Sequence, residues 1–287
     1  MNNHITDKEQ FIIVASDFFN ELFEMSFNSE CGNIEIRTFK PATQNFFKSE
    51  MDAANHAYQL WQDGIDVYFG VNPRTGNGGK KENVHYLGAF HAEIDYGKTG
   101  HKKESPSETY EEALNIIQSF TLEPTVIIHS GGGFHCYWVL SNPVKVSDIG
   151  INVLESINKA LSEKLGGDRG THDISRVLRI PGTFNFKIPD NPRPVTLISN
   201  NHKKYSLKDF EQFISADKPK PANKVVSQQP QTIFPSGSDI DIDALPISEK
   251  MKNLIKRGND GSYKTRSEAD MAVVTVLVNK GYDETQI

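Results

Sequence analysis

The sequence has few cysteines and no long apolar run. Its 287 residues include two cysteines, Cys31 and Cys136, and two such residues cannot by themselves form a four-ligand zinc site. No segment approaches the roughly 18 apolar residues of a transmembrane helix, and the first ten residues, MNNHITDKEQ, are too polar for a signal peptide. We therefore expect a chain without a membrane partner, located in a reducing cytoplasm.

Basic charge is scarce overall but concentrated locally. The formal net charge is −6 at pH 7, which argues against bulk attraction to nucleic acid. Residues 72–103, however, carry six basic side chains against three acids, and residues 164–187 carry five against two. An acidic protein with basic segments of this kind can still hold a polyanion in a cleft.

Hydrophobic periodicity predicts a mixed α/β domain over residues 1–215. The expected helices are 7–25, 46–62, 106–119, 146–165 and 206–215, and the expected strands are 33–39, 65–71, 84–96, 125–130, 134–140 and 194–198.

Beyond this domain the composition changes. Residues 217–239 are rich in Pro, Ser, Gln and Lys without a sustained period, which predicts a flexible linker over 216–244. Helical patterns resume at 245–287, where Gly258 and Gly281 are expected to end two helices. The last residues, DETQI, read as the start of a third helix, so we expect this accessory domain to be incomplete.

The first chemical motif is the triplet Glu93-Ile94-Asp95 on a predicted strand. Residues i and i+2 of a strand point to the same face, so both carboxylates stand side by side. Two like charges at that spacing are costly unless a cation lies between them. The pattern favours a metal site, although acid-x-acid triplets also occur on ordinary solvent-facing strands.

The second motif is the run SGGGFH, from Ser130 to His135, between two predicted strands. Glycines allow backbone N–H groups to approach an anion closely, and Ser130 and His135 add side-chain donors. A tight hairpin with a structural histidine is the alternative. A second glycine-rich run, TGNGGKK (75–81), lacks the Ser or Thr and the following helix of a phosphate-binding P-loop. It reads as a mobile basic loop, from which Arg74 and Lys80 are weaker candidates for contact with template or nucleotide.

The third motif is the stretch DRGTHDISRVLRIPGTFNFK (168–187). Its arginines are planar forks suited to phosphate. Asp168 follows two glycines, which allow an unusual turn that aims its carboxylate inward. Asp173 stands three residues before Arg176, so an Asp–Arg ion pair, with Arg176 or Arg179, is its simplest role.

In this order the motifs resemble the archaeo-eukaryotic primase superfamily, and most closely the RepB-like and CRISPR-associated primase-polymerases of plasmids and phages. The resemblance covers residues 30–200, and 245–287 more weakly. The matching residues are Glu93, Asp95, Ser130, Gly131, Gly133, His135, Asp168, Arg176, Arg179, Pro181, Gly182, Thr183 and Lys187.

The resemblance implies a primase-polymerase catalytic core, with an RRM-like sheet that carries the carboxylates and an N-terminal α/β part beside it. It implies template-directed nucleotidyl transfer from dNTPs or NTPs onto a primer 3′-OH or an initiating nucleotide. Two Mg²⁺ or Mn²⁺ ions would bind Glu93, Asp95 and Asp168, whereas Ser130, Gly131, Gly133, His135, Arg176, Arg179 and Lys187 would bind the nucleotide.

The resemblance also implies partners: single-stranded DNA template, primer DNA or RNA, and proteins of replication or CRISPR adaptation. Tyr96 and Tyr137 are near enough in sequence to the motifs to act as a steric gate against a 2′-OH.

Three other classes compete with this interpretation. A rolling-circle nuclease would need a closely spaced histidine pair, but the histidines at 85 and 91, and at 129 and 135, are six residues apart. An inactive nucleic-acid-binding replication initiator is disfavoured because all three acidic positions are filled. A transferase acting on small molecules fits the helical second domain less well.

Overall fold

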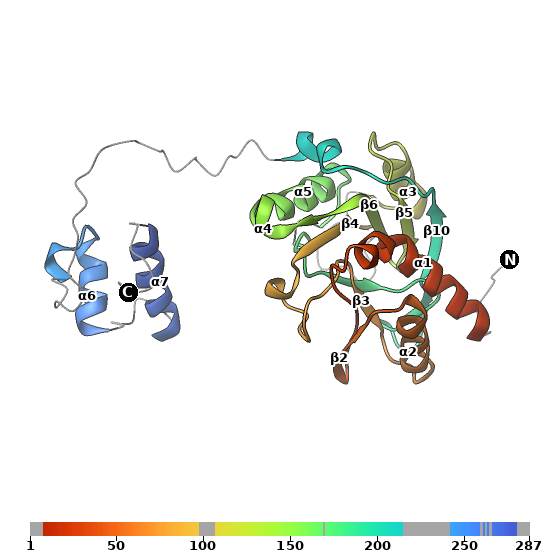
Figure 1. Cartoon of the computed structure of the whole chain (residues 1–287), viewed down its shortest axis with the longest axis horizontal. Helices are drawn as coiled ribbons and strands as arrows, with labels where there is room; N and C mark the ends of the chain where they lie inside the picture. The colour runs from red at the N-terminus through yellow and green to blue at the C-terminus, as the bar shows by residue number, and fades with distance from the viewer. Residues whose placement is uncertain are drawn as a thin grey trace. The chain divides into compact units, whose positions relative to one another are not determined.

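The computed structural model describes residues 8–97, 107–168, 170–214, 242–258, 261, 263 and 266–279. The chain divides into two compact units, Met1–Pro221 and Ala222–Ile287, and each is described by itself (Figure 1). The predicted linker lies almost entirely outside the described residues, so the domain boundaries stay a prediction. The first unit confirms the mixed α/β class.

The first of two four-stranded sheets combines three strands from the N-terminal part of this unit with one strand from residues 177–179. All its neighbours are antiparallel, in the order β2-β1-β3-β7. The elements are α1 (Lys8–Asn28), β1 (Ile34–Phe39), β2 (Ala42–Phe47), α2 (Glu50–Gln62), β3 (Tyr68–Gly70) and β7 (Val177–Arg179). Ser49 caps α2, because its hydroxyl accepts the backbone N–H of Asp52 at 3.2 Å.

The second sheet is also antiparallel, in the order β10-β5-β6-β4. Helix α3 connects β4 to β5, and β6 lies between these two strands, which is a split βαβ arrangement. The elements are β4 (Tyr86–Asp95), α3 (Tyr110–Gln118), β5 (Val126–His129), β6 (Gly133–Lys145), α4 (Val146–Ile149), α5 (Ile151–Lys164), β10 (Thr196–Asn200) and the 3-10 helices η1 (Lys81–Asn83) and η2 (Leu207–Phe213). A short pair, β8 (Phe184–Asn185) and β9 (Arg193–Pro194), completes the unit.

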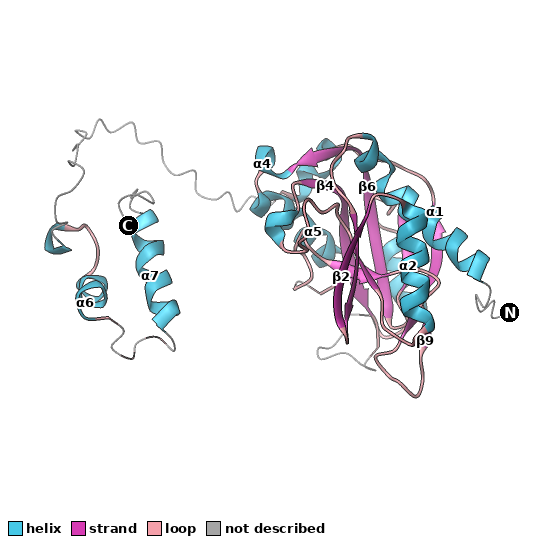
Figure 2. Cartoon of the chain, turned by 60° about the horizontal axis from the view of Figure 1, so that its bottom comes forward, coloured by secondary structure: helices cyan, strands magenta, loops and turns pink. Residues whose placement is uncertain are grey.

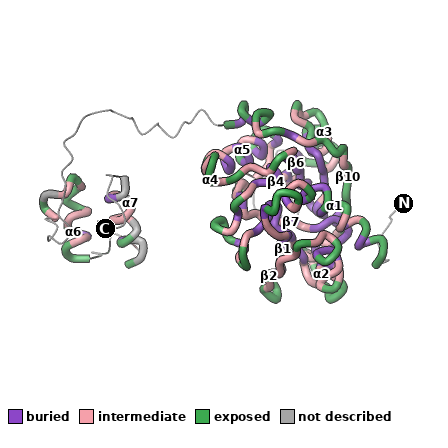
Figure 3. Tube along the Cα trace, viewed as in Figure 1, coloured by how far each residue is buried: buried purple, intermediate pink, exposed green. Residues whose placement is uncertain are grey.

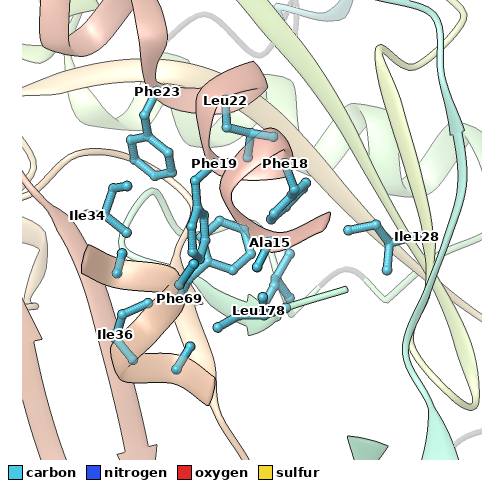
Figure 4. Packing of buried hydrophobic residues seen from close by; sticks show 14 of the residues in the cluster. Ala15, Phe18, Phe19, Leu22, Phe23, Ile34, Ile36, Phe69, Ile128 and Leu178 are labelled. Carbon is cyan, nitrogen blue, oxygen red and sulfur yellow. The ribbon is translucent and has the colours of Figure 1, made fainter. Parts of the chain in front are cut away.

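Two apolar cores pack against opposite faces of the second sheet. Phe18, Phe19 and Phe23 of α1 contact Phe69 of β3. They share one core with Ile128 of β5, so α1 packs between the sheets (Figure 4). On the other face, Phe90 and Trp138 pack with residues of α3, α5 and η2. Helices therefore lie on both sides of the strands, with the buried residues in the middle (Figures 2 and 3).

Strand β4 lies at an edge of the second sheet, and its outer backbone groups are occupied by other parts of the chain. Asn72 Oδ1 accepts the N–H groups of Gly88 and Ala89 at 2.9 and 3.1 Å. Asn158 Oδ1 accepts the His91 N–H at 2.9 Å. The Asp168 N–H donates to Glu93 O at 3.2 Å. Three separate segments thus close this edge.

Four of the five expected helices differ from the structure. The strand β2 was not predicted, and its residues 46 and 47 were assigned to a helix, because this half-exposed strand lacks apolar alternation. The helix expected from 106 begins at Tyr110, where Thr109 accepts the Glu112 N–H. The helix expected over 146–165 is broken at Gly150, whose φ is 93°. The helix expected over 206–215 is the 3-10 helix η2.

The second unit contains η3 (Ile242–Ala244), α6 (Glu249–Arg257) and α7 (Arg266–Asn279). Helix α6 begins after Ser248, whose hydroxyl accepts the Met251 N–H, and ends at Gly258 with a φ of 77°. Both helices were expected from the sequence, and Gly281 lies outside the described residues. Within the described part of the chain, no helix is long and apolar enough to cross a membrane.

Candidate active site

The predicted acids lie on the face of the second sheet that looks toward α1. Glu93 and Asp95 share this face of β4, and their cross-strand partners on β6 are His135 and Gly133. The intervening residue Ile94 packs into the opposite core. The two carboxylates and the predicted histidine are therefore brought together by strand register.

The glycine turn between β5 and β6 lies beside the Asp95 side chain at the end of this sheet. Gly131 has a φ of 84°, and the backbone N–H and the hydroxyl of Ser130 donate to Gly133 O at 2.8 and 3.1 Å. A Cβ at Gly133 would lie 2.7 Å from Asp95 Oδ1. The glycine thus leaves room for the carboxylate, while the Ser130 hydroxyl serves the hairpin itself.

Asp168 reaches the same place through the end of α5. Gly167 donates to Ser162 O at 2.7 Å and Gly166 to Glu163 O at 3.2 Å, which is the Schellman pattern of a helix C-terminus. A Cβ at Gly167 would collide with Glu93 O. This close approach sets Asp168 directly beside β4, where its carboxylate also accepts the Gly170 N–H at 2.9 Å.

The arginines of the third motif lie beside the acids. Arg176 Nε is 2.8 Å from Glu93 Oε1, and its Nη1 is 3.7 Å from Asp173 Oδ2. Arg179 Nη2 lies 3.4 Å from Asp66 Oδ1 and donates to the Tyr68 hydroxyl at 3.0 Å. Asp173 thus holds Arg176, as expected, whereas the partner of Arg179 is Asp66. Lys187 is exposed, and its backbone N–H donates to Asn185 Oδ1 at 3.0 Å.

Burial and like charge dominate the electrostatics of Glu93. Burial raises the pKa of Glu93 to about 7, against the opposing effect of Arg176 and with further increases from Asp95, Asp168 and Asp173. These three acids are therefore close enough to oppose the ionisation of Glu93.

The neighbouring histidines are held neutral. Burial, followed by the charge of Arg179, places the pKa of His135 well below its ordinary value. Burial also lowers the pKa of His91 to about 4. The Nδ1 atoms of both rings are buried without a hydrogen-bond partner among the described residues. The neutral His135 ring suits a site that offers a hydrogen bond to an anion. His91 does not, because its Nε2 donates to Thr171 O at 3.0 Å and its Nδ1 is then an acceptor.

The acids supply suitable ligands for Mg²⁺ or Mn²⁺, because both ions prefer carboxylate oxygens. In the described part of the chain, however, no three His, Cys, Asp or Glu side chains converge closely enough to hold a metal ion. The Glu93 carboxylate faces the Arg176 guanidinium instead. In this conformation the expected three-acid metal site is not assembled.

For two of the weaker candidates the predicted role is wrong. Arg74 cannot touch template or nucleotide, because its fully buried guanidinium lies 2.8 Å from Glu35 and donates to the carbonyl groups of Asn72 and Ser175. Tyr137 cannot be a steric gate, because its buried ring packs against Phe18 and Phe69.

Two further candidates lie nearer the surface. The hydroxyl of Tyr96 is 2.7 Å from His129 Nε2. Lys80 is exposed, 3.9 Å from Glu82.

Sequence reasoning missed Arg193 on β9. Its guanidinium lies over the glycine turn, where a Cβ at Gly132 would be 3.1 Å from both terminal nitrogens. Its Nε is buried without a hydrogen-bond partner among the described residues, and its charge contributes to lowering the pKa of His129. A lone arginine in the segment PDNPRP carries no periodic signal, so only the pairing of β8 with β9 reveals its position.

A replication protein is among the curated proteins to which this chain is similar over part of its length. No family model matches it. A "Replication protein" of Clostridium perfringens is 26% identical over 147 residues, covering 51% of this chain and 35% of that protein. An uncharacterized protein of Methanocaldococcus jannaschii, MJECL28, is 26% identical over 140 residues, covering 46% and 10%. The chain thus spans about a third and a tenth of these relatives.

Similar solved structures are the AEP domain of the cyanophage S-2L primase-polymerase and the primase RepB′. The TM-score is 0.49 for the former, at 14% identity over 72% of this chain and 98% of that one. For RepB′ the TM-score is 0.45, at 14% identity over 72% and 61%. Its catalytic domain in complex with initiator DNA gives 0.46, at 14% identity over 70% and 92%.

Proposed function

We propose that this chain is a primase-polymerase that transfers nucleotides from dNTPs or NTPs onto a primer 3′-OH or an initiating nucleotide, directed by a DNA template. The observation that carries the proposal is the meeting of three separate segments at one end of β4. Glu93 and Asp95 come from the strand itself, and Asp168 is fixed to it by a backbone hydrogen bond of 3.2 Å. Arg176 and His135 lie beside them.

The roles follow from chemistry and position. Glu93, Asp95 and Asp168 are the residues that we propose to hold Mg²⁺ or Mn²⁺, whose bound charge would offset that of the phosphates. The Arg176 guanidinium now pairs with the Glu93 carboxylate. We therefore expect binding of a cation to Glu93 to be coupled to release of this guanidinium.

Arg176, Arg179 and His135 would then hydrogen-bond phosphate oxygens. We propose that Arg193 and the backbone N–H groups of the glycine turn form a second anion-binding element. Lys187, an exposed cation close to Arg193 in the sequence, is a further candidate for phosphate contact.

The proposal is tested by Asp95→Asn, which keeps the size of the side chain and removes its charge. We expect extension of a primed single-stranded template with Mg²⁺ or Mn²⁺ to fall by at least about 100-fold, a loss of about 2.7 kcal/mol of transition-state stabilisation. The matched control is Asp17→Asn on the exposed side of α1, which should extend like the wild type. Extension by Asp95→Asn within about threefold of the wild type would refute the assignment.

A catalytically inactive nucleic-acid-binding initiator module is the second candidate. It is favoured by one observation, that Glu93 is engaged by Arg176 and the described acids do not converge on one point. The same assay separates the two. If the wild type binds a primed template but does not extend it with either cation, the binding module is the better assignment.

A further inference from the structure

The first sheet packs one face into the core against α1, and its other face carries polar side chains and one exposed aromatic ring. Ile36 and Phe69 are paired in register and belong to the core against α1. Because side chains alternate along a strand, Arg37, Tyr68 and Arg179 lie on the opposite face. They form one row across three strands, since Arg37 pairs with Tyr68 and Tyr68 pairs with Arg179. We call these residues, with Glu35 and Phe39, the β1–β3–β7 face.

Phe39 is the outermost member of this face. Its side chain is 54% exposed, and it is the only exposed phenylalanine among the described residues. Its ring makes a T-shaped contact with the Tyr68 ring, with centroids 5.2 Å apart. One ring surface is thus supported by the sheet while the rest meets water, which leaves apolar area that a ligand can bury.

The same row leads from Phe39 to the candidate active site. The Arg179 guanidinium lies 5.0 Å from the centre of the Tyr68 ring and donates to its hydroxyl at 3.0 Å. Arg179 ends β7, which begins directly after Arg176, and Arg176 Nε lies 2.8 Å from Glu93 Oε1. An aromatic and cationic path therefore connects an exposed ring to the acids.

The charges of this face suit a polyanion that presents flat groups. Arg37, Arg179 and the exposed Lys40 stand against two carboxylates, Asp66 and the Glu35 carboxylate that the buried Arg74 also neutralises. Arg37 is fixed by Glu35 at 2.6 Å and by Gly79 O at 3.0 Å, so it is held in place on the sheet. An exposed ring among positioned arginines is the combination by which proteins bind single-stranded nucleic acid without reading its sequence.

We propose that the β1–β3–β7 face binds single-stranded DNA, with one nucleobase stacked on Phe39 and the adjoining phosphates beside Lys40, Arg37 and Arg179. This inference rests on the proposed function, because it deepens it by naming where the template lies. Apart from Arg179, it assigns binding to residues outside the three motifs, and it predicts a base-stacking contribution that does not depend on charge.

The test measures binding of a fluorescein-labelled single-stranded oligonucleotide by anisotropy, without nucleotide or divalent cation. Phe39→Ala should raise the Kd about 5- to 100-fold, as expected for the loss of one base–aromatic stack. The slope of log Kd against log salt concentration should stay unchanged, because no phosphate contact is removed. Phe39→Trp should retain wild-type affinity. The matched control is Ile13→Ala on α1, which removes a side chain that is 58% exposed and should leave the Kd unchanged.

An abasic oligonucleotide of the same length sharpens the test. It should bind the wild type and Phe39→Ala equally, since neither can stack a base that is missing. A Kd of Phe39→Ala within twofold of the wild type on normal DNA would overturn the inference. So would equal losses on normal and abasic DNA. Failure of the proposed function looks different: Asp95→Asn would then extend primers normally, whatever Phe39→Ala does to binding.

Discussion

Glu93→Gln is expected to stabilise the protein at alkaline pH, because the carboxylate is held where its charge is unfavourable. Its pKa is about 7 in the folded protein against 4.5 as the ordinary value. Between these values the folded state keeps a proton that the unfolded chain has released, so stability falls as pH rises. A shift of this size corresponds to about 3 kcal/mol, fully lost above pH 7 and fully retained below pH 4.5.

Glutamine has the shape of the protonated acid and cannot ionise. The free energy of unfolding of Glu93→Gln should therefore match that of the wild type near pH 4.5 and exceed it by up to about 3 kcal/mol at pH 8. The pair with Arg176 does not reverse this sign, because the raised pKa already includes the opposing effect of that arginine.

The measurement is urea unfolding followed by tryptophan fluorescence at several pH values. Trp61 and Trp138 are the only two tryptophans, and both lie in the first unit. The control is Glu82→Gln, whose side chain is 69% exposed and whose substitution should change stability by less than about 0.5 kcal/mol. If Glu93→Gln is less stable than the wild type at pH 8, the ion pair with Arg176 outweighs burial and like-charge repulsion, and the electrostatic reasoning is refuted.

Two further predictions concern arginines whose roles emerged from the structure. Arg74→Met leaves Glu35 buried with Arg37 as its remaining cation, and should cost about 3–5 kcal/mol of unfolding free energy in the same urea experiment; a cost below about 1 kcal/mol would contradict its structural role. Arg193→Gln should raise the nucleotide KM about 10- to 100-fold in the extension assay, as for the loss of a charged hydrogen bond. Arg193→Lys should recover part of that loss, and an unchanged KM for Arg193→Gln would remove Arg193 from the site.

The sequence was sufficient to predict what depends on local patterns. Alternation along residues 84–96 placed Glu93 and Asp95 on one face, and the glycines at 131–133 and 166–167 marked the turns that bring the other motifs to them. Asp173 was expected beside Arg176 because residues three apart can pair across a short turn. These features need only one segment at a time, so a single sequence contains them.

Features that depend on two distant segments were not predictable in this way. Arg74 has the appearance of a loop cation, and only the fold shows that Glu35 lies opposite it, 39 residues earlier. Tyr137 follows the His motif, yet strand alternation directs its ring into the core formed by α1. The strand β2 becomes recognisable only once β1 is present to pair with it.

The closed edge of β4 has a consequence for how this protein meets other chains. An open edge strand is a template on which a foreign strand can add itself, and such edges promote aggregation. Here the amides of Asn72 and Asn158 and the backbone of Asp168 already occupy the hydrogen-bonding groups of that edge. The strand that carries Glu93 and Asp95 is therefore protected from self-association. The residue that makes this protection compatible with the site is Gly167, because any side chain there would push the Asp168 segment off the edge.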